Sequence, residues 1–250
     1  MNPGDKPTEV ALFITCLVDV FFPGLGEDVV WLLEQAGVKV VVPQGQTCCG
    51  QPPYNAGFHC DARGIATHFL DLFADAPVIV TPSGSCAMMV RQEYPHLFAD
   101  DPERLALATS IADRTYELSQ FLVDVMGQVE FGARWPGRVT YHDACHMSRG
   151  LGIVQPPRTL LAHVDGLELV EMDGDPWCCG FGGAFAVKQS PISGAMLDEK
   201  IRRIDAVSVD AVITSDAGCI MHMAGGLQRQ ERPIPVYHLA QVLSGRAAHP

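Results

Sequence analysis

The chain of 250 residues contains 17 basic and 29 acidic side chains, which gives a formal net charge of −12 at pH 7. Such an acidic balance argues against binding to nucleic acids and against adsorption to anionic membranes. Hydrophobic residues make up 48% of the chain, a globular composition, and no apolar run approaches the roughly 18 residues that a membrane-spanning helix needs.

Nine cysteines are many for a chain of this composition. The first residues are polar and no apolar signal segment follows them, so we expect a cytoplasmic protein without membrane insertion. In a reducing cytoplasm, clustered cysteines favour metal or redox chemistry over structural disulfides.

The first half of the sequence alternates between strand-like and helix-like patterns. In chain order it predicts a strand at residues 10–14, a helix at 28–36, a strand at 38–42, a helix at 65–73, a strand at 77–81 and an apolar closing helix at 118–122. Cys16, the pair Cys48 and Cys49, and Cys86 each follow one of the three strands. All four thiols are therefore expected in loops beyond strand ends.

The second half has the same organisation. It predicts strands at residues 139–141, 167–170 and 211–214, and a closing helix at 238–243. A helix is expected to begin after an N-cap at Ser190, with Pro191 as its first residue. Four cysteines again follow strands: Cys145, Cys178, Cys179 and Cys219. Residues from about 100 to 137 are expected to connect the two halves.

The spacing of the cysteines indicates an internal duplication. Matching positions differ by nearly constant offsets: 145 − 16 = 129, 178 − 48 = 130, 179 − 49 = 130 and 219 − 86 = 133. In both halves a glycine, Gly50 or Gly180, follows the adjacent pair. We therefore predict an α/β fold of two pseudo-symmetric repeats of parallel strand–helix units, at residues 8–125 and 137–245. The cysteine-bearing loops would gather at the C-terminal ends of the strands, where such sheets bind ligands.

Four convergent thiols can hold an iron–sulfur cluster, hold a zinc ion or perform disulfide chemistry. Common zinc sites use two C-x-x-C segments, whereas each half of this chain combines an adjacent pair with two distant cysteines. Two neighbouring side chains can both face a large cluster more easily than one small ion. The pattern therefore favours one or two [4Fe–4S] clusters per chain, with zinc in one site as the lesser alternative and thiol chemistry as the third.

Four segments carry a family resemblance: residues 82–86, 178–183, 185–188 and 216–222. They resemble the cysteine-rich CCG-domain proteins, which include the B subunit of heterodisulfide reductase and the iron–sulfur subunit of glycolate oxidase, and are most similar to the lactate utilization protein A family. The resemblance extends over about residues 10–243. It implies an iron–sulfur subunit that oxidises L-lactate to pyruvate together with ferredoxin-like and flavin-type partner proteins.

The chain departs from the fuller pattern of this group at one position in each half. In heterodisulfide reductase relatives the pattern ends in C-x-x-C, which gives five cysteines and a noncubane double cluster. Here the first residue of that final pair is Ser83 in one half and Asp216 in the other, so that chemistry is not implied. Asp216 could supply an oxygen ligand, but aspartate is a common N-cap and a capping role is favoured.

Three histidines lie close to the cysteines in sequence. His142 and His146 flank Cys145, and either could bind metal, carry a proton or hydrogen-bond a loop carbonyl; the sequence favours His146. His222 follows Cys219 by three residues, about one helical turn.

Two basic residues and the ninth cysteine complete the candidates. Arg149 and Lys188 could offset thiolate charge or bind a substrate carboxylate, although solvation is an equal alternative. Cys60 has no counterpart in the second half, and we predict that it is a buried helix thiol.

The sequence supports one leading hypothesis and two alternatives. The leading one is an electron-transfer subunit of a lactate-oxidising complex. The alternatives are a disulfide or heterodisulfide reductase-type catalytic subunit, disfavoured by Ser83 and Asp216, and a zinc-stabilised scaffold without enzymatic activity. No G-x-G-x-x-G segment joins a strand to a helix, so we expect no nicotinamide cofactor and place any flavin on a partner.

Overall fold

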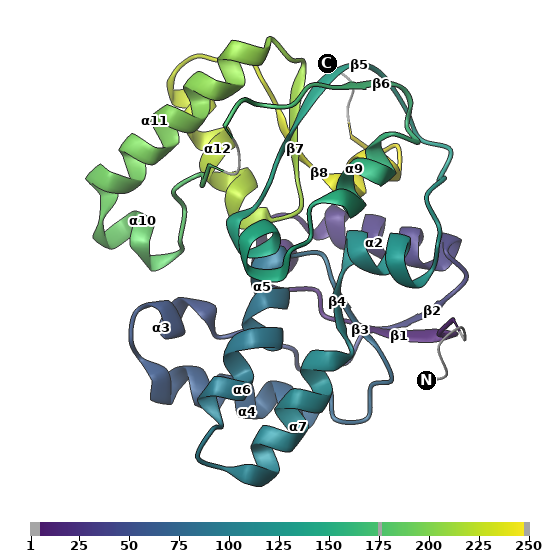
Figure 1. Cartoon of the computed structure of the whole chain (residues 1–250), viewed down its shortest axis with the longest axis vertical. Coiled ribbons are helices and arrows are strands. Elements are labelled where there is room, and N and C mark those ends of the chain that lie inside the picture. Colours follow the sequence, from purple (N-terminus) through teal and green to yellow (C-terminus); the bar gives the residue numbers. More distant parts are fainter. Residues whose placement is uncertain (1–5, 175–176, 248–250) are drawn as a thin grey trace. The chain divides into compact units, whose positions relative to one another are not determined.

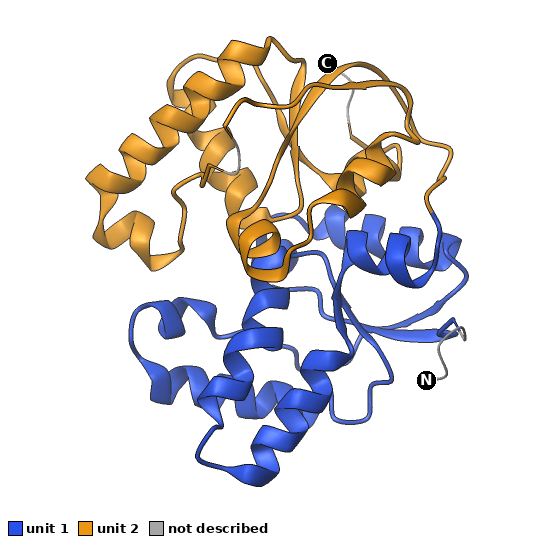
Figure 2. Cartoon of the chain, viewed as in Figure 1, with its two compact units in different colours: residues 1–128 blue, residues 129–250 orange. Residues whose placement is uncertain are grey.

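A computed structural model describes residues 6–174 and 177–247. The chain divides into two compact units, residues 1–128 and 129–250, drawn in blue and orange in Figure 2. Each unit contains its own four-stranded sheet. The polar residues at the start of the sequence, 1–5, lie outside the described residues.

The first unit builds its sheet in the strand order β2-β1-β3-β4, and every pair is parallel (Figure 1). Its elements are β1 (Glu9–Leu12), α1 (Cys16–Phe21), α2 (Pro23–Gln35), β2 (Lys39–Val41), α3 (Gln51–Asn55), α4 (His59–Leu72), β3 (Ile79–Thr81), α5 (Gly84–Met88), the π-helical turn η1 (Met89–Glu93), α6 (Tyr94–Leu97), α7 (Pro102–Asp113), β4 (Thr115–Glu117), α8 (Leu118–Gln120) and the π-helical turn η2 (Phe121–Val125). Helices connect the neighbouring strands, as parallel pairing requires.

The second unit repeats this plan with the strand order β6-β5-β7-β8, again all parallel. Its elements are β5 (Arg134–His142), the π-helical turn η3 (His146–Gly150), α9 (Gln155–Leu161), β6 (Asp165–Leu169), α10 (Ala184–Lys188), α11 (Ser190–Val207), β7 (Ala211–Thr214), α12 (Ala217–Arg229), β8 (Val236–His238) and α13 (Leu239–Leu243). The predicted α/β class and the two-repeat architecture are confirmed.

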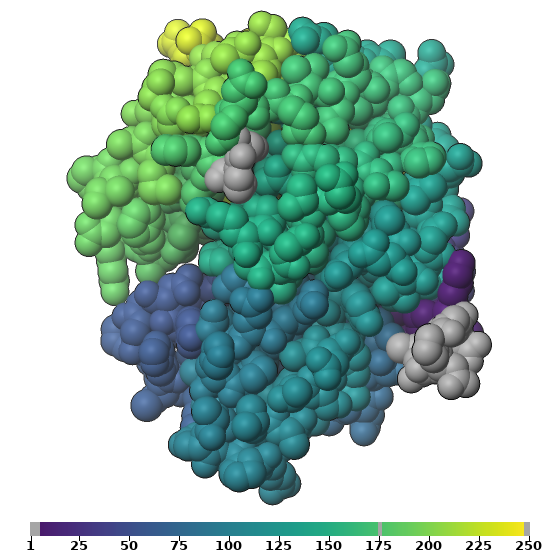
Figure 3. All heavy atoms as spheres, viewed as in Figure 1, coloured from purple at the N-terminus to yellow at the C-terminus, as the bar shows by residue number. Residues whose placement is uncertain are grey.

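The central strands β3 and β7 are buried on both faces. All three residues of β3 and all four residues of β7 are buried, a pattern typical of parallel sheets covered by helices. Drawn with all heavy atoms, the side chains fill the spaces between the ribbons within each unit (Figure 3). No helix within the described ranges has both the length and the apolar character to cross a membrane.

Two local predictions are wrong. Residues 100–137 do not merely connect the halves, because α7 and β4 complete the first unit and β5 already begins at Arg134. The helix expected to start after Ser190 includes that residue, and Gln189 is its N-cap. The preceding helix α10 ends only at Lys188, so the carbonyl of Gln189 accepts the first bond of α11, from the N–H of Ser193.

The prediction for Cys60 is half right. Cys60 lies on a helix, α4, but its side chain is exposed rather than buried. The buried stripe of α4 passes through Ala62, Ala66 and Phe69. Because successive helical residues are about 100° apart, Cys60 points away from that stripe.

The turn after each cysteine pair depends on glycine. Gly180 has φ +92°, and a Cβ there would lie 2.7 Å from the carbonyl oxygen of Ser193 in α11. Gly50 holds the same place in the first unit with φ +83°, where a Cβ would lie 3.4 Å from the carbonyl oxygen of Ala62 in α4. Glycine therefore lets each cysteine loop approach the long helix that follows it.

Replacing Gly180 by alanine should destabilise the protein by at least about 2 kcal/mol, because the new Cβ meets backbone in a conformation that alanine disfavours. The matched control is Gly194→Ala within α11, where a Cβ would meet nothing within 4 Å. That change should stabilise the helix by about 0.5–1 kcal/mol. Urea unfolding followed by circular dichroism measures both, and equal effects would contradict the assigned role of Gly180.

Candidate functional site

In each unit the cysteines follow three neighbouring strands of one sheet. The chain leaves β1, forms β2 on one side of it and then crosses to form β3 on the other side. The loops after β1 and β3 therefore diverge at a switch point, the place outside the carboxyl ends of parallel strands where such sheets bind ligands. The order β6-β5-β7 creates the same arrangement in the second unit.

The four thiols of the first repeat form one continuous cluster. Side-chain hydrogen bonds join Cys16 to Cys48 and Cys48 to Cys49, and Cys49 is joined in turn to Cys86. Hydrogen bonds from Cys16 and then from Cys49 lower the pKa of Cys48 to about 3. The backbone N–H of Gly50 also donates to the Cys48 sulfur at 3.4 Å. A thiolate is the form of cysteine that binds metal.

One side chain ties together the two loops that carry Cys16 and the first cysteine pair. The Oε1 atom of Gln46 accepts a hydrogen bond from the N–H of Ile14 at 3.0 Å, and its Nε2 donates to the carbonyl of Leu12 at 2.8 Å. Gln46 therefore continues the pairing of β1 and β2 beyond the ends of both strands. This contact fixes the separation of the two loops.

Two further residues shape the first site. Thr15, immediately before Cys16, has φ 69°, a conformation that β-branched residues rarely adopt and that is found most often at functional sites. Tyr94 is fully buried and donates its hydroxyl to the carbonyl oxygen of Cys49 at 2.9 Å. Nothing in the local sequence pattern relates Tyr94 to the cysteines, so only the structure reveals this contact.

The second repeat arranges its thiols in the same order. The Sγ of Cys178 lies 3.8 Å from that of Cys145, and the Sγ of Cys179 lies 3.3 Å from that of Cys219. A side-chain hydrogen bond joins Cys178 to Cys179, and the N–H of Gly180 donates to the Cys178 sulfur at 3.3 Å. The structure thus brings all eight predicted cysteines into two groups of four.

Ser83 and Asp216, which replace the fifth cysteine of the fuller pattern, both cap helices. The Oγ of Ser83 accepts from the N–H of Cys86 at 3.3 Å at the start of α5. The Oδ1 of Asp216 accepts from the N–H of Gly218 at 3.1 Å at the start of α12. The capping role predicted for Asp216 is therefore the one that the structure shows.

His222 supports the glycine turn of the second repeat. Its Nε2 lies 3.2 Å from the Oγ of Ser193, and that hydroxyl donates to the carbonyl of Gly180 at 2.8 Å. Because the serine proton is used in this bond, Nε2 must be the donor to Ser193. The His222 ring also lies 5.9 Å from the ring of Phe181, centroid to centroid. Burial lowers the pKa of His222.

The two basic candidates differ in their placement. A hydrogen bond with Cys178 and burial raise the pKa of Cys145, and the side chain of Arg149, in η3, opposes this rise by its charge and by a hydrogen bond to Cys145. Lys188 is exposed in the last turn of α10. Arg149 is thus the cation that the described structure brings to a thiol.

His142 lies beside the thiols of the second repeat. His142 is the last residue of β5 and is fully buried, and one of its ring nitrogens lies within 4.8 Å of the sulfurs of both Cys179 and Cys219. Burial, and secondarily the charge of Lys200, lowers the pKa of His142 well below its usual range, so the imidazole is neutral. His146 is half-buried at the first position of η3.

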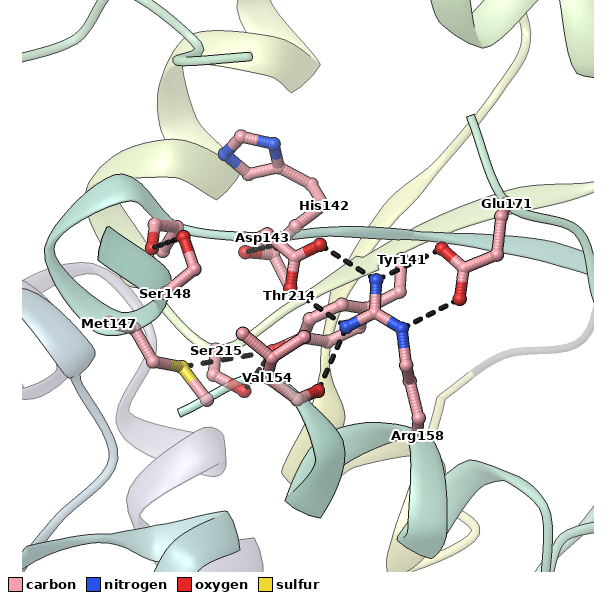
Figure 4. A network of polar contacts seen from close by, with 11 residues as sticks. Tyr141, His142, Asp143, Met147, Ser148, Val154, Arg158, Glu171, Thr214 and Ser215 are labelled. Carbon is pink, nitrogen blue, oxygen red and sulfur yellow. Dashed lines mark hydrogen bonds and ion pairs between the residues drawn. The ribbon is translucent and has the colours of Figure 1, made fainter. Parts of the chain in front are cut away.

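An ion-pair network holds the loop between His142 and Cys145. Arg158 in α9 donates two hydrogen bonds to Asp143, at 2.9 and 2.7 Å, and two to Glu171, at 2.6 and 2.9 Å. Figure 4 shows the imidazole of His142 extending away from this network, on the other side of the chain from the Asp143 carboxylate. Consecutive residues at a strand end point in opposite directions, so fixing Asp143 also fixes the direction of His142.

The comparisons with known proteins agree with this arrangement. A family model described as a cysteine-rich domain (CCG) matches the chain twice, at residues 10–91 and 139–224. Lactate utilization protein A from Geobacillus thermodenitrificans is 50% identical over 238 residues, which cover 95% of this chain and 99% of that protein. Lactate utilization protein A 2 from Bacillus cereus strain AH820 is 47% identical over 236 residues, 94% of this chain and 98% of that protein.

The chain belongs to the lactate utilization protein A family. The family resemblance inferred from the sequence is confirmed. A solved structure of a hypothetical protein from Helicobacter pylori superimposes with a TM-score of 0.66 at 12% identity, over 98% of this chain and 51% of that chain. The chain spans about half the length of that protein, and the likeness concerns the fold alone.

The donor set of this lactate utilization protein A relative fits an iron–sulfur cluster in each repeat. Four cysteines is the usual ligand number of a [4Fe–4S] cluster, and the glycine N–H donors supply the hydrogen bonds to sulfur that tune such sites. The sulfur separations of 3.3 and 3.8 Å also suit a single zinc ion, whose thiolates lie about 3.8 Å apart for bonds of about 2.3 Å. A four-iron cluster binds each thiolate at a different iron, so the cysteine side chains must turn apart to receive it.

In this lactate utilization protein A relative, replacing Arg158 by lysine should lower the free energy of unfolding by about 1–3 kcal/mol. Lysine cannot form the paired bonds to Asp143 and Glu171, and the Asp143 carboxylate is nearly buried. The control is Arg138→Lys, since the Arg138 side chain is 44% exposed and a surface change of this kind alters stability by about 0.5 kcal/mol or less. Chemical unfolding of both variants tests this, and a loss that is equal in the two would contradict it.

Proposed function

We propose that this chain binds one [4Fe–4S] cluster in each repeat and carries electrons released when L-lactate is oxidised to pyruvate. The observation that carries the proposal is the convergence of four thiols at the switch point of each sheet, in the same order in both repeats. The names of the relatives supply the substrate, because several are called lactate utilization protein A.

Oxidation of L-lactate breaks one O–H and one C–H bond at the hydroxyl-bearing carbon, forms a carbonyl, and releases two electrons and two protons. We place the transfer of both electrons as a hydride on a flavin of a partner protein, which then releases single electrons and a proton. When bound, an iron–sulfur cluster supplies one-electron transfer. The part of this chain is to hold the clusters with its thiolates and to set their surroundings with Gly50, Gly180, Tyr94 and Arg149.

Exposed apolar side chains near the cysteines support a role within a complex. The described residues with large exposed apolar side chains are Val20, Phe21, Val42, Phe58, Trp177, Val187 and Ile192. All of them lie on the segments that run from the carboxyl ends of β1, β2 and β6 into the following helices. Partner proteins that exchange electrons must approach these loops, and exposed apolar side chains are typical of such contacts. We propose ferredoxin-like and flavin-type partners in the cytoplasm.

The disulfide reductase alternative is weakened by the caps at Ser83 and Asp216. In each repeat the residue that stands in place of the fifth cysteine uses its side-chain oxygen to start a helix. The noncubane chemistry of five-cysteine relatives would need a further sulfur ligand at this position. Zinc in one repeat remains the second candidate, favoured by the short sulfur separations in the second repeat.

Anaerobic purification followed by iron, sulfide and zinc analysis tests the proposal. We expect about eight iron atoms and eight sulfides per chain. Cys49→Ser and Cys179→Ser should each remove about half of both, since each changes one buried thiol of one repeat. Cys60→Ser is the matched control and should change neither, because Cys60 is exposed on α4 and stands outside both groups of four thiols.

Two results would contradict this assignment. Stoichiometric zinc without sulfide would identify a scaffold. A chain that binds neither iron nor zinc and keeps eight reactive thiols would favour disulfide chemistry. If iron is bound but a flavoprotein supplied with lactate does not reduce the clusters, the cluster assignment would hold and the assignment of lactate as the electron source would be wrong.

A further inference from the structure

The buried side chains that lie behind the thiols, called the wall, can be compared between the two repeats position by position. They come from the residue three positions before the first cysteine and from the long helix that packs on the glycine turn. Phe13 and His142 each lie three positions before the first cysteine of their repeat; Phe13 directly follows β1, and His142 is the last residue of β5. The helices α4 and α11 match through their contacts with the glycine turns, at Ala62 and Ser193, an offset of 193 − 62 = 131. The buried positions 66, 69, 70 and 73 of the first repeat then correspond to 197, 200, 201 and 204 of the second, all of which are buried.

In the first repeat this wall is hydrocarbon. Phe13 and Phe69 are both buried, and their rings pack edge to face with centroids 4.9 Å apart. Phe73 packs against both rings. These three side chains have no atom that can bind a metal or donate a hydrogen bond, so they add no donor to the four thiols of the first site.

In the second repeat the same two positions are polar. His142 replaces Phe13 and Lys200 replaces Phe69, and both side chains are fully buried. Burying an imidazole and an ammonium in a domain core costs stability, whereas a pair of phenyl rings adds to it. A buried position that holds a polar side chain in spite of this loss of stability is a candidate for function.

The nitrogens of His142 are the second observation that points to a ligand. Neither Nδ1 nor Nε2 makes a hydrogen bond to any described residue, although both atoms are buried. An unsatisfied buried polar group costs about 1–3 kcal/mol. One of these nitrogens nevertheless lies within 4.8 Å of the sulfurs of Cys179 and Cys219, and the three atoms are mutually within that distance. This spacing suits three ligands of one metal ion.

Resting on the proposed function, we propose that His142 is a ligand of the metal group in the second repeat, where five donors, four cysteines and one imidazole, surround four coordination positions, so that His142 takes a position that a thiolate fills in the first repeat. The fifth donor comes from the end of β5 and not from the position of Asp216, whose side chain caps α12. Coordination would satisfy one buried nitrogen, and His142 is fixed in direction by the Asp143–Arg158 ion pair behind it.

Unequal donor sets give the two sites unequal reduction potentials. Imidazole ligation raises the potential of an iron–sulfur site relative to thiolate ligation. The second repeat would therefore hold an electron more tightly than the first. A redox titration of the loaded protein should resolve two midpoint potentials.

The direct test is pulsed EPR of the full-length protein, reconstituted anaerobically with iron and sulfide and reduced to its paramagnetic state. We expect hyperfine coupling to an imidazole nitrogen, which changes when the histidines are labelled with ¹⁵N. His142→Phe, which installs the residue of the first repeat, should abolish the coupling. His146→Phe should leave it intact, so this pair of variants separates the histidine favoured by the geometry from the one favoured by the sequence.

The possible outcomes separate the inference from the function on which it rests. A loaded protein without nitrogen coupling, or with coupling that survives His142→Phe, would overturn the inference and leave the cluster assignment standing. The label experiment on the unaltered chain and the smaller change His142→Gln guard against misfolding of the phenylalanine variant.

If the chain takes up no iron, the proposed function fails. The inference is then decided by Zn²⁺ titration, in which His142→Phe should weaken binding about tenfold or more and an unchanged affinity would overturn it.

Discussion

The parallel pairing of three neighbouring strands is the constraint on which both sites depend. Parallel strands end at the same edge of a sheet, and the order β2-β1-β3 brings three loops to one place although their residues are up to 70 positions apart in the sequence, from Cys16 to Cys86 (86 − 16 = 70). The order β6-β5-β7 does the same in the second unit. No contact within a single helix or hairpin could gather four thiols in this way, so the sheet topology is itself part of the metal site.

The glycine after each cysteine pair converts that topology into a defined geometry. Its left-handed backbone lets the loop turn sharply onto the following long helix, and its N–H donates to the first sulfur of the pair, at 3.4 Å from Gly50 and 3.3 Å from Gly180. The same glycine thus allows the sharp turn, because it has no Cβ, and stabilises the negative charge of the thiolate through its N–H. The same double use in both repeats explains why the three-residue pattern is so well preserved between two halves that otherwise differ.

The two repeats correspond in the loops that carry the cysteines and differ in the side chains behind those loops. The thiols, the glycine turns and the helix caps correspond in both repeats, whereas the wall behind the thiols is aromatic in one and cationic and imidazole-bearing in the other. Phe13 and Phe69 stabilise the first unit by packing, while His142 and Lys200 contribute polar groups at some loss of stability. Duplicated sites that share a ligand set can differ in potential through such surroundings, and an electron-carrying protein gains a direction of transfer from the difference.

The sequence by itself determined the class, the duplication and the eight cysteines, because strand-period apolar runs and constant cysteine offsets are local and countable. It also determined the role of Asp216, since a capping residue acts on the N–H groups next to it in the chain. It failed at β4, whose three residues Thr115–Glu117 have no apolar run and become a strand only by pairing with β3. It favoured His146 over His142, and this preference stays a prediction, because closeness to Cys145 in sequence says nothing about which side of a strand end each ring faces. Only the tertiary structure decided that His142 lies at the thiols and that Cys60 does not, since burial and direction depend on which distant elements pack against each side chain.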